Sequence, residues 1–115
     1  MTTTTQGASE RITEAVTAWP GVVAGTGSRG EWGFNIGRRS IGHLHGDRVA
    51  HFAFPRELAA GLKAAGRVGP HPIDKPGLAA RRIEGEADVL EVIELMRMNY
   101  DRAVANYGVP GTDAA

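Results

Sequence analysis

Cysteine is absent from all 115 residues of the chain. Its absence excludes disulfide bonds, thiolate metal ligands and a cysteine nucleophile. Long apolar runs are lacking too, because none approaches the ~20 residues that a membrane-spanning helix needs. The opening MTTTTQGASE also lacks the charged and apolar segments of a secretory signal. We therefore expect a cytoplasmic protein without a membrane partner.

A net charge is missing as well, since thirteen basic residues balance thirteen acidic ones. Broad electrostatic attraction to nucleic acid is therefore not expected. A chain of this length commonly forms one domain, and it can bury roughly two thirds of the surface that the unfolded chain exposes. We expect a single domain over residues 8–107, with disordered ends at residues 1–7 and 108–115.

Short apolar segments separated by turns occupy the first half of the chain. The segment EWGFNIG (residues 31–37) alternates apolar residues with Glu, Gly or Asn, which is typical of a strand with one buried face. Similar segments lie at residues 22–27, 40–45 and 48–54, and a further candidate lies at residues 78–85. These segments predict an antiparallel meander sheet of four to five strands.

Helical signals lie on both sides of these strands. Ser9 is placed to cap a first helix, which Pro20-Gly21 ends. Pro55 opens a second helix, and Gly66 is suited to the position that follows its last turn.

The last third of the chain contains a loop and the clearest helical pattern. Residues 67–77 are rich in proline and glycine and predict a loop. The apolar spacing over residues 86–106 predicts a long C-terminal helix. Strands followed by helices favour the α+β class, with the helices packed on one face of the sheet.

Histidine is concentrated in one stretch, RRSIGHLHGDRVAHFAF (residues 38–54), which holds His43, His45 and His51. Alternate residues of a strand share a face, so His43 and His45 point the same way, together with Ile41. A two-residue turn after His45 sends His51 to the opposite face, whereas a three-residue turn places all three histidines on one face. We favour the three-residue turn because it separates the histidines from the aromatic residues, although a slip of one residue reverses the outcome.

Three interpretations of these histidines remain open. They are half-exposed sheet residues, they line a ligand pocket without a metal, or they bind zinc, iron, copper or nickel through three imidazoles. His71, in the segment GPHPI, is a candidate fourth ligand or a base. Asp47 and Asp74 are the nearest carboxylates in the sequence, and both lie in expected turns.

Two further motifs have both a functional and a structural interpretation. GTGSRG (residues 25–30) is glycine-rich, but a strand rather than a helix follows it, so it predicts a hairpin loop and not a phosphate cradle. The pairs Arg38-Arg39 and Arg81-Arg82 are suited to binding an anion, and such pairs are also common as solvated surface residues.

Four motifs in a fixed order give the chain a likeness to a known family. They are WPGV (residues 19–22), GRRSIGHLHG (37–46), FPRELAAGLKAAGRVGPHPI (54–73) and ELMRMNYDRA (94–103). In combination they resemble the short bacterial members of the luciferase-domain family, which share a domain with the luciferases of luminous fungi. The resemblance extends over residues 19–104, and it is specific as a combination although each motif alone is weak.

The resemblance implies a catalytic site. His43, His45, His51 and His71 all match histidines of the fungal domain, which makes them the candidate catalytic residues. Fungal luciferases oxidise a hydroxylated pyrone with molecular oxygen and without an added metal. That chemistry implies a histidine that deprotonates the substrate and cationic groups that stabilise the oxyanion, a role for which Arg39 is a candidate.

Substrate contacts and cofactors are expected on the same basis. Trp32 and Phe52 are candidate substrate contacts, although their alternation with polar residues favours a place in the core. No cofactor is expected, and a metal ion on His43, His45 and His51 is the alternative.

The chain departs from the family pattern at three positions. Ser40 stands where the family has a glutamate, so a carboxylate suited to orienting a histidine is missing. Many bacterial members carry aspartate at the position of His51, and Leu78 stands where an aromatic residue is usual.

We therefore expect a luciferase-domain protein that binds a small molecule in a histidine-lined pocket, with a cofactor-free oxygenase as the enzymatic hypothesis. Two alternatives stay open: a non-catalytic α+β module that binds nucleic acid or a protein partner, and a His-ligated metal-binding protein. The mutual distances of the four histidines discriminate among them. A shared pocket fails if His43 and His51 point to opposite faces.

Overall fold

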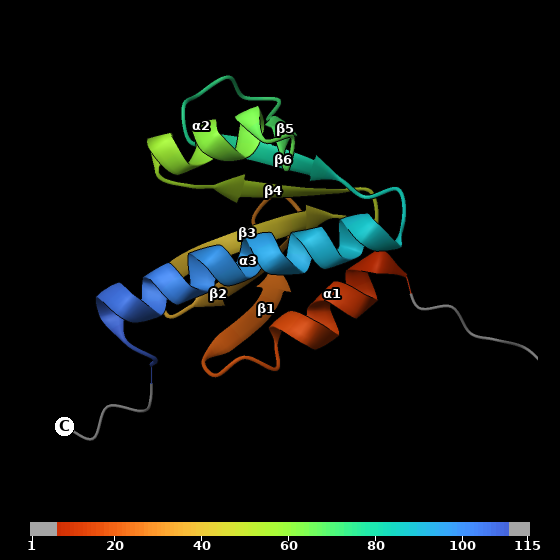
Figure 1. The fold of residues 1–115 in the computed structure, drawn as a ribbon. Helices are drawn as coiled ribbons and strands as arrows, with labels where there is room; N and C mark the ends of the chain where they lie inside the picture. Colours follow the sequence, from red (N-terminus) through yellow and green to blue (C-terminus); the bar gives the residue numbers. More distant parts are fainter. Residues whose placement is uncertain (1–6, 111–115) are drawn as a thin grey trace, which may run out of the picture.

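The computed structural model describes residues 7–110, and within them the chain forms three helices and six strands (Figure 1). In chain order these are α1 (Ala8–Val16), β1 (Val22–Thr26), β2 (Trp32–Ile36), β3 (Arg39–His45), β4 (Val49–Ala53), α2 (Arg56–Ala64), β5 (Gly69–Pro70), β6 (Leu78–Arg82) and α3 (Glu86–Tyr107). The predicted disordered ends fall mostly on residues outside this range.

The strands form one antiparallel sheet in the order β1-β2-β3-β4-β6-β5. The first four strands make the predicted meander, and β6 is the predicted fifth strand. The sixth strand, β5, lies in the segment that was predicted to be loop throughout, and that prediction was wrong at Gly69 and Pro70. These two residues pair with Ala80 and Ala79 at the sheet edge, where a proline without an N–H is tolerated.

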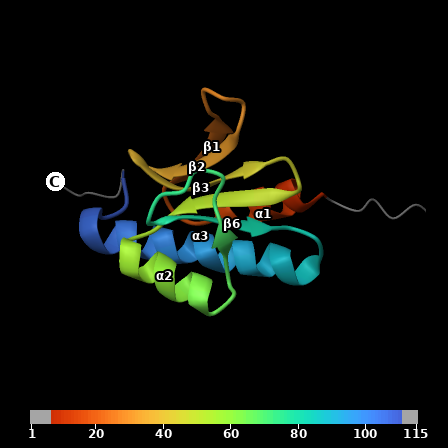
Figure 2. The same ribbon diagram turned by 90° about the horizontal axis from the view of Figure 1, so that it is seen from above.

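All three helices pack on one side of the sheet, which confirms the predicted α+β architecture. Figure 2 shows α2 and α3 below the sheet, and α1 packs against α3. The long helix α3 contributes seven buried residues, which are Val89, Val92, Leu95, Met96, Asn99, Tyr100 and Ala103. The opposite face of the sheet carries no helix among the described residues. The core therefore lies between the helices and one face of the sheet.

The start of α1 is capped by a residue from the β3–β4 turn. The helix begins after Gly7, and the N–H of Ser9 donates to the carboxylate of Asp47 at 2.7 Å. The expectation that Ser9 is the cap was wrong, because Ser9 lies inside the first turn. A distant carboxylate accepts one of the N–H groups that the first turn leaves without an intrahelical partner, and its charge also suits the helix N-terminus.

The end of α2 has the predicted glycine. Gly66 has a φ of +75°, its N–H donates to the carbonyl of Lys63, and the N–H of Arg67 donates to the carbonyl of Leu62. These two bonds form a Schellman motif, in which glycine relieves the strain of the left-handed conformation. The motif turns the chain toward β5.

A bulge interrupts the pairing of β2 and β3 just before the histidines. The register shifts between Phe34 and Asn35, and Ile41 is completely buried in the core instead of sharing the histidine face as expected. Gly42 follows with a φ of +146°, and a Cβ there would lie 2.7 Å from the sulfur of Met96. Since the bulge breaks the alternation, the simple period-two rule holds only from Gly42 onward.

No helix within residues 7–110 is both long enough and apolar enough to cross a membrane.

Candidate functional site

The β3–β4 hairpin has the register that brings its histidines to one face. His43 pairs with His51 and His45 pairs with Val49, so the turn contains the three residues 46–48. On the other face, Leu44 and Ala50 are completely buried. The favoured three-residue turn is confirmed, and the alternation of the two strands separates the histidines from the core.

The three imidazoles of the hairpin are in mutual contact. His45 Nε2 lies 3.1 Å from His51 Nδ1, and one nitrogen from each of the three rings lies within 4.8 Å of the others. His43 and His51 are partly buried, whereas His45 is exposed. We refer to these three residues as the histidine triad.

His71 joins the triad from a distant part of the chain. Its ring centroid lies 4.2 Å from that of His51, and its Nδ1 accepts a hydrogen bond of 2.9 Å from the N–H of Ile73. An Nδ1 that accepts a hydrogen bond carries no proton, so in the neutral ring the proton is on Nε2. The structure therefore brings all four candidate catalytic histidines together.

Small residues flank the histidines across the sheet. A single row of paired positions crosses all six strands, and it consists of Gly25, Gly33, His43, His51, Ala80 and Gly69. A Cβ at Gly25 would meet no atom within 4 Å. The histidines thus project from a sheet surface that has little side-chain bulk on either side of them.

The environment favours the neutral form of three of these imidazoles, those of His43, His51 and His71. Burial, together with the neighbouring rings of His71, His45 and His43, lowers the pKa of His51 to about 4. Burial also lowers the pKa of His43 and of His71 below the usual value for histidine. At neutral pH these three rings are therefore uncharged, and His43 and His51 each keep one nitrogen lone pair.

Glu31 is a charged neighbour that the sequence reasoning did not single out. Its negative charge opposes the lowering of the His43 pKa, and the pKa of Glu31 is itself lowered, chiefly by backbone N–H groups and to a smaller extent by His43 and His45. The signal was present in the sequence, because Glu31, the residue before β2, shares a face with Gly33 in the alternating segment EWGFNIG. Gly33 pairs with His43, so this face is the histidine face.

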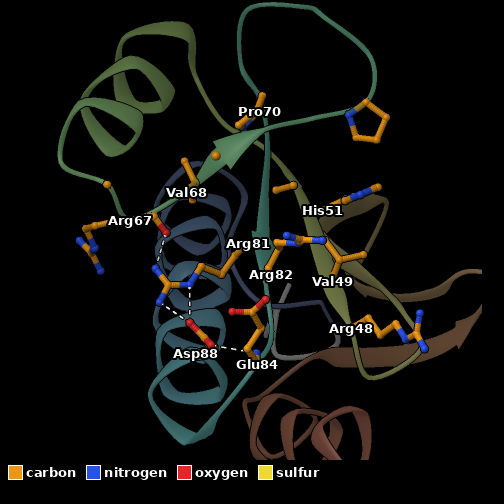
Figure 3. A pocket seen from close by; sticks show the side chains of 14 residues that line it. Arg48, Val49, His51, Arg67, Val68, Pro70, Arg81, Arg82, Glu84 and Asp88 are labelled. Atoms are coloured by element: carbon orange, nitrogen blue, oxygen red, sulfur yellow. Dashed lines mark hydrogen bonds and ion pairs between the residues drawn. The ribbon is translucent and has the colours of Figure 1, made fainter.

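A groove of about 860 Å³ adjoins the triad (Figure 3). His51 is the one triad member that lines it, and Pro72, next to His71, lines it as well. Arg48 and Arg82 also line the groove, and neither forms an ion pair within residues 7–110. The groove is therefore lined both by an imidazole of the triad and by guanidinium groups that have no carboxylate partner in the described structure.

The other arginine of the predicted anion-binding pair has a structural role. Arg81 donates to the carboxylate of Asp88 at 2.5 Å and to the carbonyl of Arg67 at 2.9 Å, on the side of the groove away from His51 (Figure 3). Asp88 also accepts the N–H groups of Glu84 and Gly85 before α3. Arg81 thus ties β6 to the start of α3.

The candidate substrate contacts Trp32 and Phe52 lie on the helix side of the sheet. The indole N–H of Trp32 donates to Thr13 Oγ1 at 2.9 Å, and Phe52 is 3% exposed and stacks on Phe54. The structure therefore does not bring Trp32 and Phe52 to the histidines, because adjacent strand residues point to opposite faces.

Arg39 and Ser40 are also remote from the triad, because they lie at the opposite end of β3. The Arg39 guanidinium carbon lies 3.9 Å from the ring centroid of Tyr107, and Ser40 lines a separate pocket with Asn99 and Arg102. A carboxylate at position 40 would therefore face Arg102 rather than orient a histidine. The expected consequence of the missing glutamate was wrong for this reason.

The comparison with protein families adds a finding to this geometry. The model of the luciferase domain matches residues 38–99, which is more than half of the chain. The chain belongs to the luciferase-domain family. The matched region begins before β3 and extends into α3, so it contains all four histidines and all the lining residues of the groove. No curated protein and no solved structure matches the chain.

Proposed function

We propose that this luciferase-domain protein binds a small anionic organic molecule in the groove and acts on it at the histidines. The observation that carries the proposal is the position of His51, which belongs both to the triad and to the wall of the groove. A molecule held in the groove therefore reaches an imidazole nitrogen without entering the apolar core.

The groove suits a ligand of this class by size and charge. Small-molecule sites typically occupy about 300–1,000 Å³, and this groove has a volume of about 860 Å³. Arg48 and Arg82 offer charge-assisted hydrogen bonds to a carboxylate or an enolate oxygen. The uncrowded sheet surface around His43 and His51 favours a flat ring over a branched ligand.

The chemistry that we propose is oxidation of an enolisable ring compound by molecular oxygen. In this proposal a neutral imidazole accepts the acidic proton of such a ligand, and the Nε2–H of His71, beside His51, donates to the resulting oxyanion. Support for oxygen as the co-substrate comes from the family resemblance, and support for proton transfer comes from the positions of the histidines.

Ligand binding is the first test. The purified protein is titrated with a set of hydroxypyrones by calorimetry, and Arg48→Ala and Arg82→Ala are each expected to weaken binding roughly tenfold or more, as for the loss of a charge-assisted hydrogen bond. Arg38→Ala is the matched control, because Arg38 is exposed and lines a different pocket. Equal affinity in all three variants contradicts the proposed binding site.

Oxygen consumption is the second test. An oxygen electrode records the rate of oxygen consumption when the purified protein is mixed with each hydroxypyrone that binds. The double variant His43→Ala, His45→Ala serves as the comparison. Turnover by the wild-type protein that the double variant loses supports the oxygenase proposal. Equal rates in both proteins contradict a catalytic role for the triad.

A further inference from the structure

We propose that His43, His45 and His51 form a three-ligand binding site for one divalent transition metal ion. The proposal goes beyond the proposed function, because it rests on the donor atoms of the triad and requires no organic ligand. It also specifies His71 as a neighbour of the ion and not as a ligand.

The donor geometry matches what a small metal ion requires. In a tetrahedral zinc site with bonds of about 2.1 Å, the ligand nitrogens lie roughly 3.4 Å apart. His45 Nε2 and His51 Nδ1 are separated by 3.1 Å, and one donor nitrogen from each of the three rings lies within 4.8 Å of the others. Small changes in ring torsion angles therefore suffice to bring the third nitrogen to the coordination distance.

The scaffold holds these donors in place before any ion binds. His43 and His51 are directly paired across two antiparallel strands, and His45 is two residues along the same strand. The Cα positions are therefore set by the backbone hydrogen bonds of the sheet and by the buried residues Leu44 and Ala50 behind them. A site on rigid strands loses little conformational entropy when a metal binds.

One charged neighbour of the triad, Glu31, also favours a cation. Neutral imidazoles bind metals through their lone pairs, and Glu31 interacts electrostatically with His43 and His45. Lys63 is a positive group near this site, and it acts on the more distant His71. Glu31 therefore supplies a negative charge that partly balances a dication at the triad, although Arg48 and Arg82 line the adjoining groove.

His71 is excluded from the ligand set by its own hydrogen bond. The N–H of Ile73 occupies Nδ1 at 2.9 Å, so the proton of the neutral ring is on Nε2 and no lone pair is free. His71 is instead a hydrogen-bond donor beside His51. Three protein ligands leave a coordination position open, which is typical of catalytic rather than structural metal sites.

The donor set also selects the class of ion. Three imidazoles without a thiolate or a direct carboxylate suit zinc, cobalt, nickel and copper, whereas calcium and magnesium prefer oxygen ligands. We therefore expect Zn²⁺ and Co²⁺ to bind and Mg²⁺ not to compete with them.

The test uses the full chain without a histidine tag, freed of metal by a chelator. Co²⁺ is added while the visible absorption is recorded, and Zn²⁺ binding is measured by calorimetry. One ion per chain and ligand-field bands of four-coordinate cobalt are the expected results. Absence of saturable binding at this stoichiometry overturns the proposal with the wild-type protein alone.

Variants assign the ligands. His43→Ala, His45→Ala and His51→Ala are each expected to lower the affinity at least about 100-fold, which exceeds the usual range for changes outside the ligand shell. His71→Ala is the matched control and is expected to keep the stoichiometry and most of the affinity. Retained affinity in the first three variants, with folding verified by circular dichroism, overturns the site. Loss of binding in His71→Ala overturns the three-ligand assignment.

The same samples separate this proposal from the proposed function. Hydroxypyrone binding is measured with the metal-free protein, because the proposed contacts with Arg48 and Arg82 do not require the ion. Hydroxypyrone binding without metal binding overturns the metal site alone. Metal binding without hydroxypyrone binding supports the metal site and contradicts the proposed function.

Discussion

The two faces of the β3–β4 hairpin share one backbone but differ in burial and in the type of side chain that they carry. One face carries Leu44, Ala50 and Phe52, which are at most 3% exposed and pack beneath the helices. The other carries the histidine triad, which no helix covers among the described residues. Because successive residues of a strand point to opposite faces, the same two strands carry core residues on one face and the histidines on the other.

This contrast means that neighbouring residues should respond differently to the same change. Truncation on the helix side removes apolar contacts and leaves a cavity, whereas truncation on the histidine side removes partly exposed rings. The predictions below test how complete that separation is.

The largest expected difference is between Phe52→Ala and His51→Ala. Phe52→Ala should lower the free energy of unfolding by roughly 3–5 kcal/mol, because it empties a closely packed part of the core. His51→Ala should cost about 1 kcal/mol or less, as is usual for changes outside the core, while lowering the metal affinity at least about 100-fold. Urea denaturation of both variants with a chelator present measures the difference, and similar losses would show that the triad is a structural element.

A smaller difference is expected between two glycines of the same strand region. Gly42→Ala should cost about 3 kcal/mol, because the new methyl group meets Met96 and the backbone has a strained φ of +146°. Gly46→Ala should cost roughly 1 kcal/mol, because its φ of +60° is unfavourable while its surroundings are open. Thermal unfolding of the two variants checks the order, and an equal cost would mean that Met96 moves aside.

A further difference is expected in the pH dependence of stability in the metal-free protein. Burial lowers the pKa of His51 to about 4, whereas a histidine of the unfolded chain titrates near 6.5. The unfolded state then binds more protons between these values, so stability should fall as the pH drops from about 6.5 to 4. The unfolding free energy, measured by denaturation at each pH in this window, should depend less steeply on pH in His51→Ala.

The helix side should respond in a separate, more acidic window. The N–H of Glu84 and the guanidinium of Arg81 lower the pKa of Asp88. This stabilisation is present above the pKa of the unfolded carboxyl group, near 3.9, and is lost as the pH falls through the folded value. Asp88→Asn should therefore leave the slope above about pH 5 unchanged, and a changed slope there would show that the two regions are coupled.

Local sequence patterns were sufficient for the long helix and for the hairpin. The period of the apolar residues predicted α3 to within one residue, because its amphipathic pattern is sustained over 22 residues. The three-residue turn was predicted because only that register separates the histidines from Phe52 and Ala50.

Other features depended on interactions between distant parts of the chain. Ile41 was assigned to the histidine face because strict alternation was assumed, whereas Ile41 is the extra residue of a β-bulge in β3 that only the pairing with β2 reveals. Ser40 was linked to the histidines by its place in a motif, although it lies beside Arg102 of α3. The strand β5 is two residues long, so it has no periodicity to detect.

The sequence determines that three histidines share a face, because strand alternation and turn length depend only on residues that are close together in the chain. The arrival of His71 beside His51, the charge of Glu31 near His43 and the groove next to the triad depend on how β5, β6 and the β1–β2 hairpin are placed. Those placements come from pairing between strands, which in the case of β4 and β6 joins residues that are far apart in the sequence, such as His51 and Ala80. The sequence alone therefore specifies a triad of ligand-like residues, and the folded sheet makes it a site beside a groove.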